Sequence, residues 1–151
     1  MFIFAQIKER DYRRMKITKS VLEKLFVEYN AKYFDGFLTM PTMTTYVGQN
    51  SMGIFEAKEG GRIIRMKISI ARNFNITKEE LRDLLLHEMI HEYVYLKYKK
   101  ITHGGEFAKK MKELNETYGF DIRKNSKHLF RKYKNKVSLF KRILLFITRR
   151  T

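Results

Sequence analysis

A long uninterrupted helix that carries two histidines constrains this chain more than any other feature of its sequence. Residues 62–103 contain neither glycine nor proline. Thr77 followed by Glu80 forms a capping box, a pair of side chains that starts a helix. We therefore expect one helix over residues 78–99.

The two histidines lie inside this helix in the pattern His87-Glu88-Met89-Ile90-His91. Residues four apart share one helix face, where two imidazoles can bind one metal ion. The glutamate between them then stands beside the metal and can take a proton from metal-bound water. His87 and His91 are therefore candidate zinc ligands, Glu88 is the candidate catalytic residue, and the chemistry indicated is peptide-bond hydrolysis.

A simpler interpretation is that His87 and His91 are half-buried polar residues and that Glu88 faces solvent. The three residues before the motif, Leu84 to Leu86, argue against it because they indicate a buried side of the helix. Unpaired polar groups on such a side cost about 1 to 3 kcal/mol each. Metal ligation removes that cost.

A catalytic zinc site usually has three protein ligands and one open position. Aspartate, glutamate and histidine are all possible third ligands, and the best candidate is His103, on a short loop after the helix. A few extended residues at about 3.3 Å each span enough distance to return the chain toward His91. We therefore expect the site to bind one zinc ion.

Three further residues have open or minor roles in this site. Glu106 either caps the next helix, which we favour, or binds a ligand imidazole. Asp83, one turn before the first histidine, is either a partner of that imidazole or an ordinary surface acid. We interpret His128 as a surface or packing residue.

The remaining pattern predicts a mixture of helices and strands. A first helix starts at Thr18 or Ser20 and stops at Asp35-Gly36, and another opens near Gly104-Gly105-Glu106 and closes at Gly119. Its Phe107, Met111 and Leu114 form one apolar stripe, with Lys109, Lys110 and Lys112 facing solvent. Segments 42–47, 53–57 and 62–70 are predicted strands, and Glu59-Gly60-Gly61 supplies the positive φ angles for an antiparallel hairpin between the last two.

Charge and composition restrict the partners of the chain. The 151 residues carry a net charge of +16 and no cysteine, which excludes disulfides, cysteine nucleophiles and cysteine-based zinc sites. Residues 121–151 hold eleven Lys or Arg and one acid, a net charge of +10, with interleaved aromatic residues. We expect this segment to bind nucleic acid; the alternatives are packing of 137–147 on the domain, or a basic helix on an anionic membrane.

The termini lack the features of targeting or membrane segments. The apolar residues 1–5 have no basic region before them, so we expect a cytoplasmic protein rather than a secreted one. The apolar run 143–147 is far shorter than the ~20 residues that span a bilayer. We divide the chain into an extension (1–16, with Met15 an alternative start to Met1), one domain (17–120) and a basic segment (121–151), and we treat it as a monomer.

Several short motifs together resemble the SprT-like zinc metalloprotease domain over about residues 17–119. They are Asn30-Ala31-Lys32-Tyr33-Phe34-Asp35-Gly36-Phe37-Leu38, Gly53 opening a strand, Leu85-Leu86-His87-Glu88-Met89-Ile90-His91, and His103-Gly104-Gly105-Glu106-Phe107. The resemblance implies an α+β, zincin-like fold with His87, His91 and His103 as zinc ligands and Glu88 as acid and base. It also implies a sheet edge that holds an extended peptide, for which 53–57 is our candidate.

Two functions from different classes are consistent with these observations. The first is a zinc-dependent endopeptidase; eukaryotic members of the family digest proteins crosslinked to DNA, so the resemblance implies DNA-bound proteins as substrates. The second is a non-catalytic basic module that binds DNA and uses zinc only to hold its fold.

The chain departs from some family members because, without cysteine, it has no zinc ribbon after the protease domain. No tyrosine, including Tyr93 and Tyr95, is selected by its spacing as the group that stabilises the carbonyl oxygen.

Overall fold

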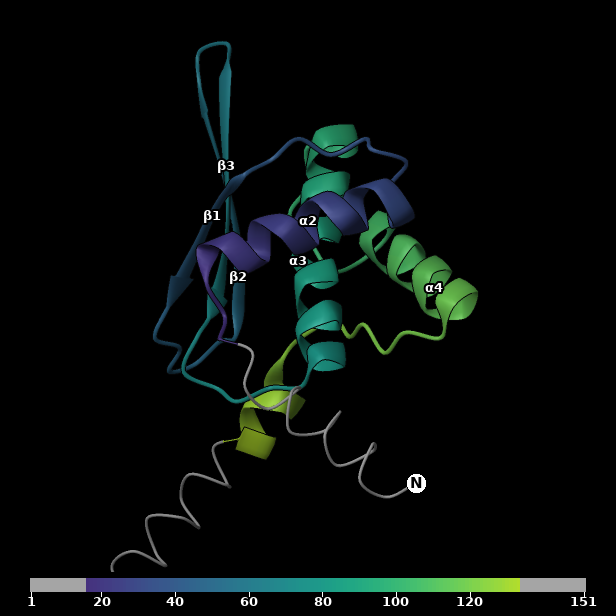
Figure 1. The fold of residues 1–151 in the computed structure, drawn as a ribbon. Coiled ribbons are helices and arrows are strands. Elements are labelled where there is room, and N and C mark those ends of the chain that lie inside the picture. The colour runs from purple at the N-terminus through teal and green to yellow at the C-terminus, as the bar shows by residue number, and fades with distance from the viewer. Residues whose placement is uncertain (1–15, 134–151) are drawn as a thin grey trace, which may run out of the picture.

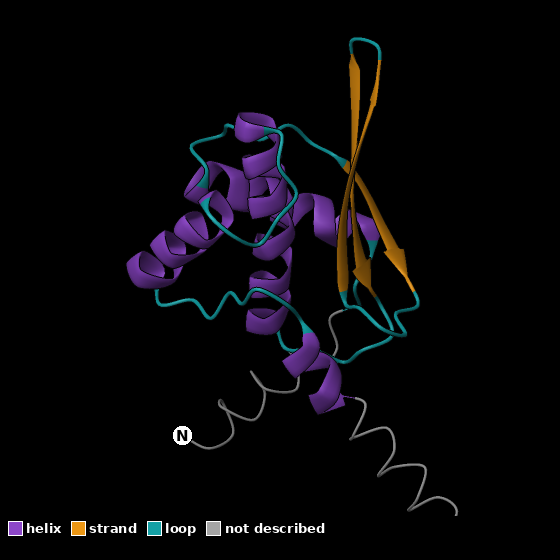
Figure 2. Ribbon diagram, turned by 180° about the vertical axis from the view of Figure 1, so that it is seen from behind, coloured by secondary structure: helices purple, strands orange, loops and turns teal. Residues whose placement is uncertain are grey.

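A three-stranded sheet and the helices that cover one of its faces make up the fold. The computed structural model describes residues 16–133, and the α+β class expected from the sequence is confirmed (Figures 1 and 2). The elements follow in the order α2 (Lys19–Tyr33), β1 (Thr42–Tyr46), β2 (Gly53–Gly60), β3 (Ile63–Ala71), α3 (Lys78–Tyr98) and α4 (Glu106–Tyr118). Residues 127–133 are also helical.

The sheet is mixed and has β3 at its centre. β2 pairs antiparallel with β3, as the sequence predicted, and β1 pairs parallel with the other side of β3. The strand order β1-β3-β2 therefore leaves β2 at one edge of the sheet. This edge position matters because β2 also contributes to the candidate site.

The hairpin between β2 and β3 extends beyond the three-stranded part of the sheet. β1 pairs only with residues 67–71 of β3, so residues 57–60 and 63–66 form a two-stranded ribbon that projects from the molecule (Figure 1). The turn has a positive φ of 62° at Gly61 alone. Gly60 is the last residue of β2 rather than a turn residue with positive φ, which corrects our expectation for Glu59-Gly60-Gly61.

Side-chain caps set the start of two helices. The hydroxyl of Thr18 accepts a hydrogen bond from the Val21 N–H at the start of α2, and that of Thr77 accepts one from the Glu80 N–H at the start of α3. α3 ends at Tyr98, and its C-cap residue Lys99 adopts a left-handed conformation with φ 55°. The long helix is thus confirmed to within one residue of its predicted end.

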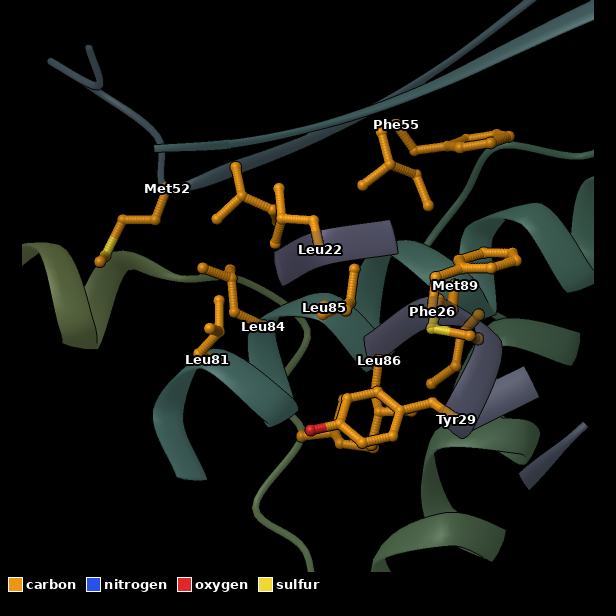
Figure 3. Close-up of a cluster of buried hydrophobic side chains, with 14 of the residues drawn as sticks. Leu22, Phe26, Tyr29, Met52, Phe55, Leu81, Leu84, Leu85, Leu86 and Met89 are labelled. Atoms are coloured by element: carbon orange, nitrogen blue, oxygen red, sulfur yellow. The ribbon is translucent and has the colours of Figure 1, made fainter. Parts of the chain in front are cut away.

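The core lies between α2, α3 and the sheet. Figure 3 shows Leu22 and Phe26 of α2 beside Leu85 and Met89 of α3, with Phe55 reaching in from β2. Apolar residues at helical spacing on α2 and α3 face each other across this space, and their burial is the main stabilising contribution. No helix within residues 16–133 is long and apolar enough to cross a membrane.

Lys110 of α4 differs from its expected exposure. It is only 9% exposed, whereas Lys109 and Lys112 are exposed as predicted. Its Nζ lies 2.8 Å from Glu113 and 5.1 Å from the centroid of the Tyr93 ring. The long methylene stem of a lysine can be buried when its charged end has a carboxylate and an aromatic face to contact.

Candidate metal centre

The buried middle of α3 carries the first two histidines of the candidate site. His87 and His91 are both buried, and Glu88 between them is only 3% exposed. The leucines that precede them anchor this part of the helix against α2 and the sheet (Figure 3). The polar side chains therefore lie inside the molecule and not on a solvated face, contrary to the simpler interpretation.

The loop after α3 brings the third histidine back to the helix. The chain turns at Lys99, whose N–H donates to the Tyr95 carbonyl at 2.9 Å. His103 Nε2 then lies 3.0 Å from His91 Nε2 and 3.1 Å from His87 Nε2. The loop therefore brings His103 back to His87 and His91, as expected from the sequence.

Phe107 of α4 packs against all three imidazoles. Its ring centroid lies 4.9 Å from that of His87, 4.6 Å from that of His91 and 5.0 Å from that of His103. The side chain is fully buried. The sequence analysis placed Phe107 in an apolar stripe and in the motif that follows His103, but it did not predict that this ring contacts the three imidazoles.

The geometry of the three histidines fits a metal ion. Their ligand nitrogens lie within 4.8 Å of one another. Zinc–nitrogen bonds of about 2.0 to 2.1 Å at tetrahedral angles would separate the nitrogens by about 3.3 to 3.4 Å, close to the 3.0 and 3.1 Å that are observed. A small adjustment of the side chains would place all three nitrogens around one ion.

The hydrogen bond on the far side of His87 fixes its tautomer. His87 Nδ1 lies 2.6 Å from the backbone carbonyl oxygen of Arg123. Because a carbonyl oxygen only accepts, Nδ1 carries the proton and Nε2 directs its lone pair at the other two imidazoles. Such a second hydrogen bond is usual for a histidine that binds metal.

Burial keeps the three imidazoles neutral. It lowers the pKa of His87 to about 4 and that of His91 to about 3, and it lowers the pKa of His103. Neighbouring charges add to the effect: the other two histidines lower the pKa of His91 further, and the Lys124 ammonium lowers that of His103. Neutral imidazole is the form that coordinates a metal.

Glu88 faces β2 across a very short gap. A Cβ atom added to Gly53 would lie 2.5 Å from Glu88 Oε1, so only glycine leaves room for the carboxyl group. Burial raises the pKa of Glu88 to about 8. The carboxyl group is thus held inside the site, next to both histidines of its own helix.

A cavity of about 200 Å³ opens beside the cluster. Residues 53–55 of β2 form one wall, and α3 contributes Leu84, His87, Glu88 and His91. His103 and residues 124–126 complete the lining. The carboxyl group and the imidazoles therefore border the same space as an edge strand of the sheet.

Asp83 and Glu106 take neither of the roles that the sequence suggested for them. Asp83 Oδ1 accepts from Arg82 Nε at 2.9 Å and Oδ2 accepts from the Asp121 N–H at 3.4 Å, so this carboxylate holds the loop that supplies the Arg123 carbonyl. Glu106 is the first residue of α4; the N-cap is Gly105, and no side chain among residues 16–133 caps that helix.

The other candidates lie outside the cluster. His128 is partly buried and borders a neighbouring cavity of about 270 Å³. Tyr95 donates to Glu59 Oε1 at 2.6 Å, and Tyr93 accepts from Lys97 Nζ at 2.9 Å. Neither tyrosine borders the cavity beside the histidines.

The family follows from a comparison of the whole sequence. The sequence model of the SprT-like family matches residues 22–128. The chain belongs to the SprT-like family. The match includes all three clustered histidines and Glu88, and SprT-like domains have a zincin-like fold and are generally metallopeptidase-like. A comparison with curated proteins finds no match.

Proposed function

We propose that this SprT-like protein is a zinc-dependent endopeptidase. The observation that carries the proposal is the convergence of three neutral imidazoles beside a buried glutamate, at a cavity that an edge strand borders. His87, His91 and His103 hold the metal in this proposal, and the fourth position is left for water and substrate. When bound there, zinc supplies a Lewis acid that activates both water and the scissile carbonyl.

Glu88 is the general base and then the general acid. Without a metal its pKa is raised to about 8 by burial. A divalent cation nearby lowers that pKa, because opposite charge favours the carboxylate. The carboxylate takes the proton of the attacking water and passes it to the leaving amine.

The edge strand β2 supports a peptide as substrate. Residues 53–55 border the cavity, and β2 has a partner strand on one side only. An extended peptide can add to such an edge through backbone hydrogen bonds, which do not depend on its sequence. We infer that the substrate is an unfolded or extended segment of a protein, including proteins bound to DNA.

Replacing Glu88 by glutamine tests the reaction directly. The purified protein is expected to hold about one zinc ion per chain, and Glu88→Gln is expected to keep that ion while cleavage of an unfolded protein falls at least about 100-fold, the usual scale of general acid–base catalysis. The matched control is Glu79→Gln, an exposed acid in the first turn of the same helix. Equal cleavage by wild type and Glu88→Gln would refute the role of Glu88.

The basic segment 121–151 favours nucleic acid as a partner. Its net charge of +10 accounts for much of the +16 of the chain. The second candidate function, a non-catalytic DNA-binding module with a structural zinc, rests on the same charge. Under that candidate, wild-type protein shows no cleavage above that of Glu88→Gln, with or without DNA.

A further inference from the structure

The segment after α4 is attached to the candidate site at several points. The side-chain amide of Asn115 brackets Ile122, donating to its carbonyl and accepting from its N–H, both at 2.9 Å. The Asp121 N–H donates to Asp83 on α3, and the Arg123 carbonyl accepts from His87. The backbone is therefore held against the histidine cluster up to residue 123.

Lys124 follows directly and borders the same cavity as Glu88 and His103. It is the only lysine or arginine among the described residues that line this cavity. Its side chain makes no ion pair with any residue of the described range 16–133. Within residues 16–133, the positive charge of Lys124 therefore has no neutralising partner, and it borders the site.

Lys124 borders the cavity together with two neutral polar residues, Asn125 and Ser126. Both neutral side chains can donate a hydrogen bond to a developing anion, but neither carries a positive charge to stabilise it. An ammonium on a flexible four-carbon stem can follow a carbonyl oxygen as its geometry changes.

We propose that Lys124 is a catalytic residue whose Nζ donates a hydrogen bond to the oxygen of the scissile carbonyl as that oxygen becomes negative. The proposal rests on the peptidase function proposed above. The water oxygen bonds to the carbonyl carbon, the C=O electron pair moves to the oxygen, and Glu88 holds the water proton. When the C–N bond breaks, the pair returns and the amine leaves with the proton from Glu88. Lys124 keeps its own proton throughout.

Removing and restoring the charge at position 124 tests this assignment. Lys124→Gln is expected to lower kcat for an unfolded protein, without nucleic acid present, by about 100- to 1000-fold, the usual loss for one oxyanion donor. KM, zinc content and melting temperature are expected to stay close to wild type. Lys124→Arg is expected to recover at least a tenth of the activity, because it restores a cationic donor.

Lys109→Gln is the matched control. Lys109 is an exposed lysine of α4 that does not border the cavity. Its cleavage rate is expected to equal that of wild type. An equal loss in Lys109→Gln would assign the effect to general charge and overturn the proposal.

Two other outcomes would overturn it as well. Unchanged kcat in Lys124→Gln would refute the catalytic role of Lys124. A rise in KM alone would show that Lys124 contributes only to substrate affinity. In both cases wild type still cleaves faster than Glu88→Gln, so the peptidase function stands. If wild type cleaves no faster than Glu88→Gln, the peptidase function fails, and the assignment of Lys124 fails with it.

Discussion

Gly53 is a glycine because of the space that its neighbour needs. Its φ is not positive, so its conformation is open to other residues. The constraint comes from α3: a Cβ at this position would lie 2.5 Å from Glu88 Oε1 and 3.2 Å from Leu84 Cδ1. The resemblance singled out this glycine from the sequence, and the structure supplies the physical reason.

Gly53→Ala is therefore expected to damage the site rather than the strand. The added methyl group displaces the Glu88 carboxyl group, and overpacking of this kind typically costs about 1 to 3 kcal/mol of stability. Cleavage is expected to fall more than the loss of folded protein explains, as measured by kcat beside a denaturant titration. Gly60→Ala on the same strand is the control, because a Cβ there would have no atom within 4 Å. Full activity in Gly53→Ala would show that Glu88 has room that the structure does not indicate.

At the scale of elements, the helices could be predicted because their signals are local. Thr77 caps α3, and Gly119 ends α4 in a left-handed conformation, as the spacing indicated. The parallel pairing of β1 with β3 had no local signal, since it depends on how α2 and α3 pack on the sheet. The strand patterns alone therefore did not tell edge strands from central ones. The candidate edge 53–57 came with the family resemblance, and β2 does lie at an edge of the sheet.

The residues of the candidate site also differ in whether the sequence alone could predict them. His87 and His91 follow from helical periodicity, and His103 from its place on a short loop. The Arg123 carbonyl that orients His87 lies 36 residues further along the chain. Because every residue has a backbone carbonyl, residue type does not indicate which carbonyl makes this contact. Lys124 also escaped notice, because in the sequence it is one of many basic residues near the C-terminus.

Asn115 links α4 to the loop that orients His87. Asn115→Ala removes both hydrogen bonds to Ile122 and leaves buried backbone groups unpaired, at a cost of about 1 to 3 kcal/mol. Zinc affinity is expected to fall about 10- to 100-fold, the usual loss when the groups that support a metal ligand are mutated. Competition with a chelator of known affinity measures it, and Thr117→Ala, an exposed residue of α4, is the control. Unchanged zinc affinity in Asn115→Ala would show that these hydrogen bonds to the loop do not affect the metal site.

At the scale of the molecule, some cations of the basic segment lie away from the candidate site. Within the described part of the basic segment, Arg123 is paired with Asp121 and Lys132 with Glu80. Lys127 and Arg131 are exposed and have no ion pair with residues 16–133. The alternatives for 137–147, packing on the domain or binding a membrane, concern residues outside the described range. The exposed, unpaired cations are the ones free to neutralise phosphates.

Binding to nucleic acid is expected to depend steeply on salt, because each phosphate neutralised releases counterions. The logarithm of the association constant should fall linearly with the logarithm of salt concentration, with a slope of about −0.7 per contact for single-stranded DNA. Replacing both Lys127 and Arg131 by glutamine should make that slope shallower by about 1.4. Lys16 and Lys24, which are also exposed, provide the control: their double glutamine variant loses the same charge from another part of the surface and should keep the wild-type slope. Fluorescence anisotropy with a labelled oligonucleotide between 50 and 200 mM salt, roughly the range over which such slopes are resolved, measures all three proteins. Equal changes in both variants would mean that overall charge, and not the basic segment, attracts the nucleic acid.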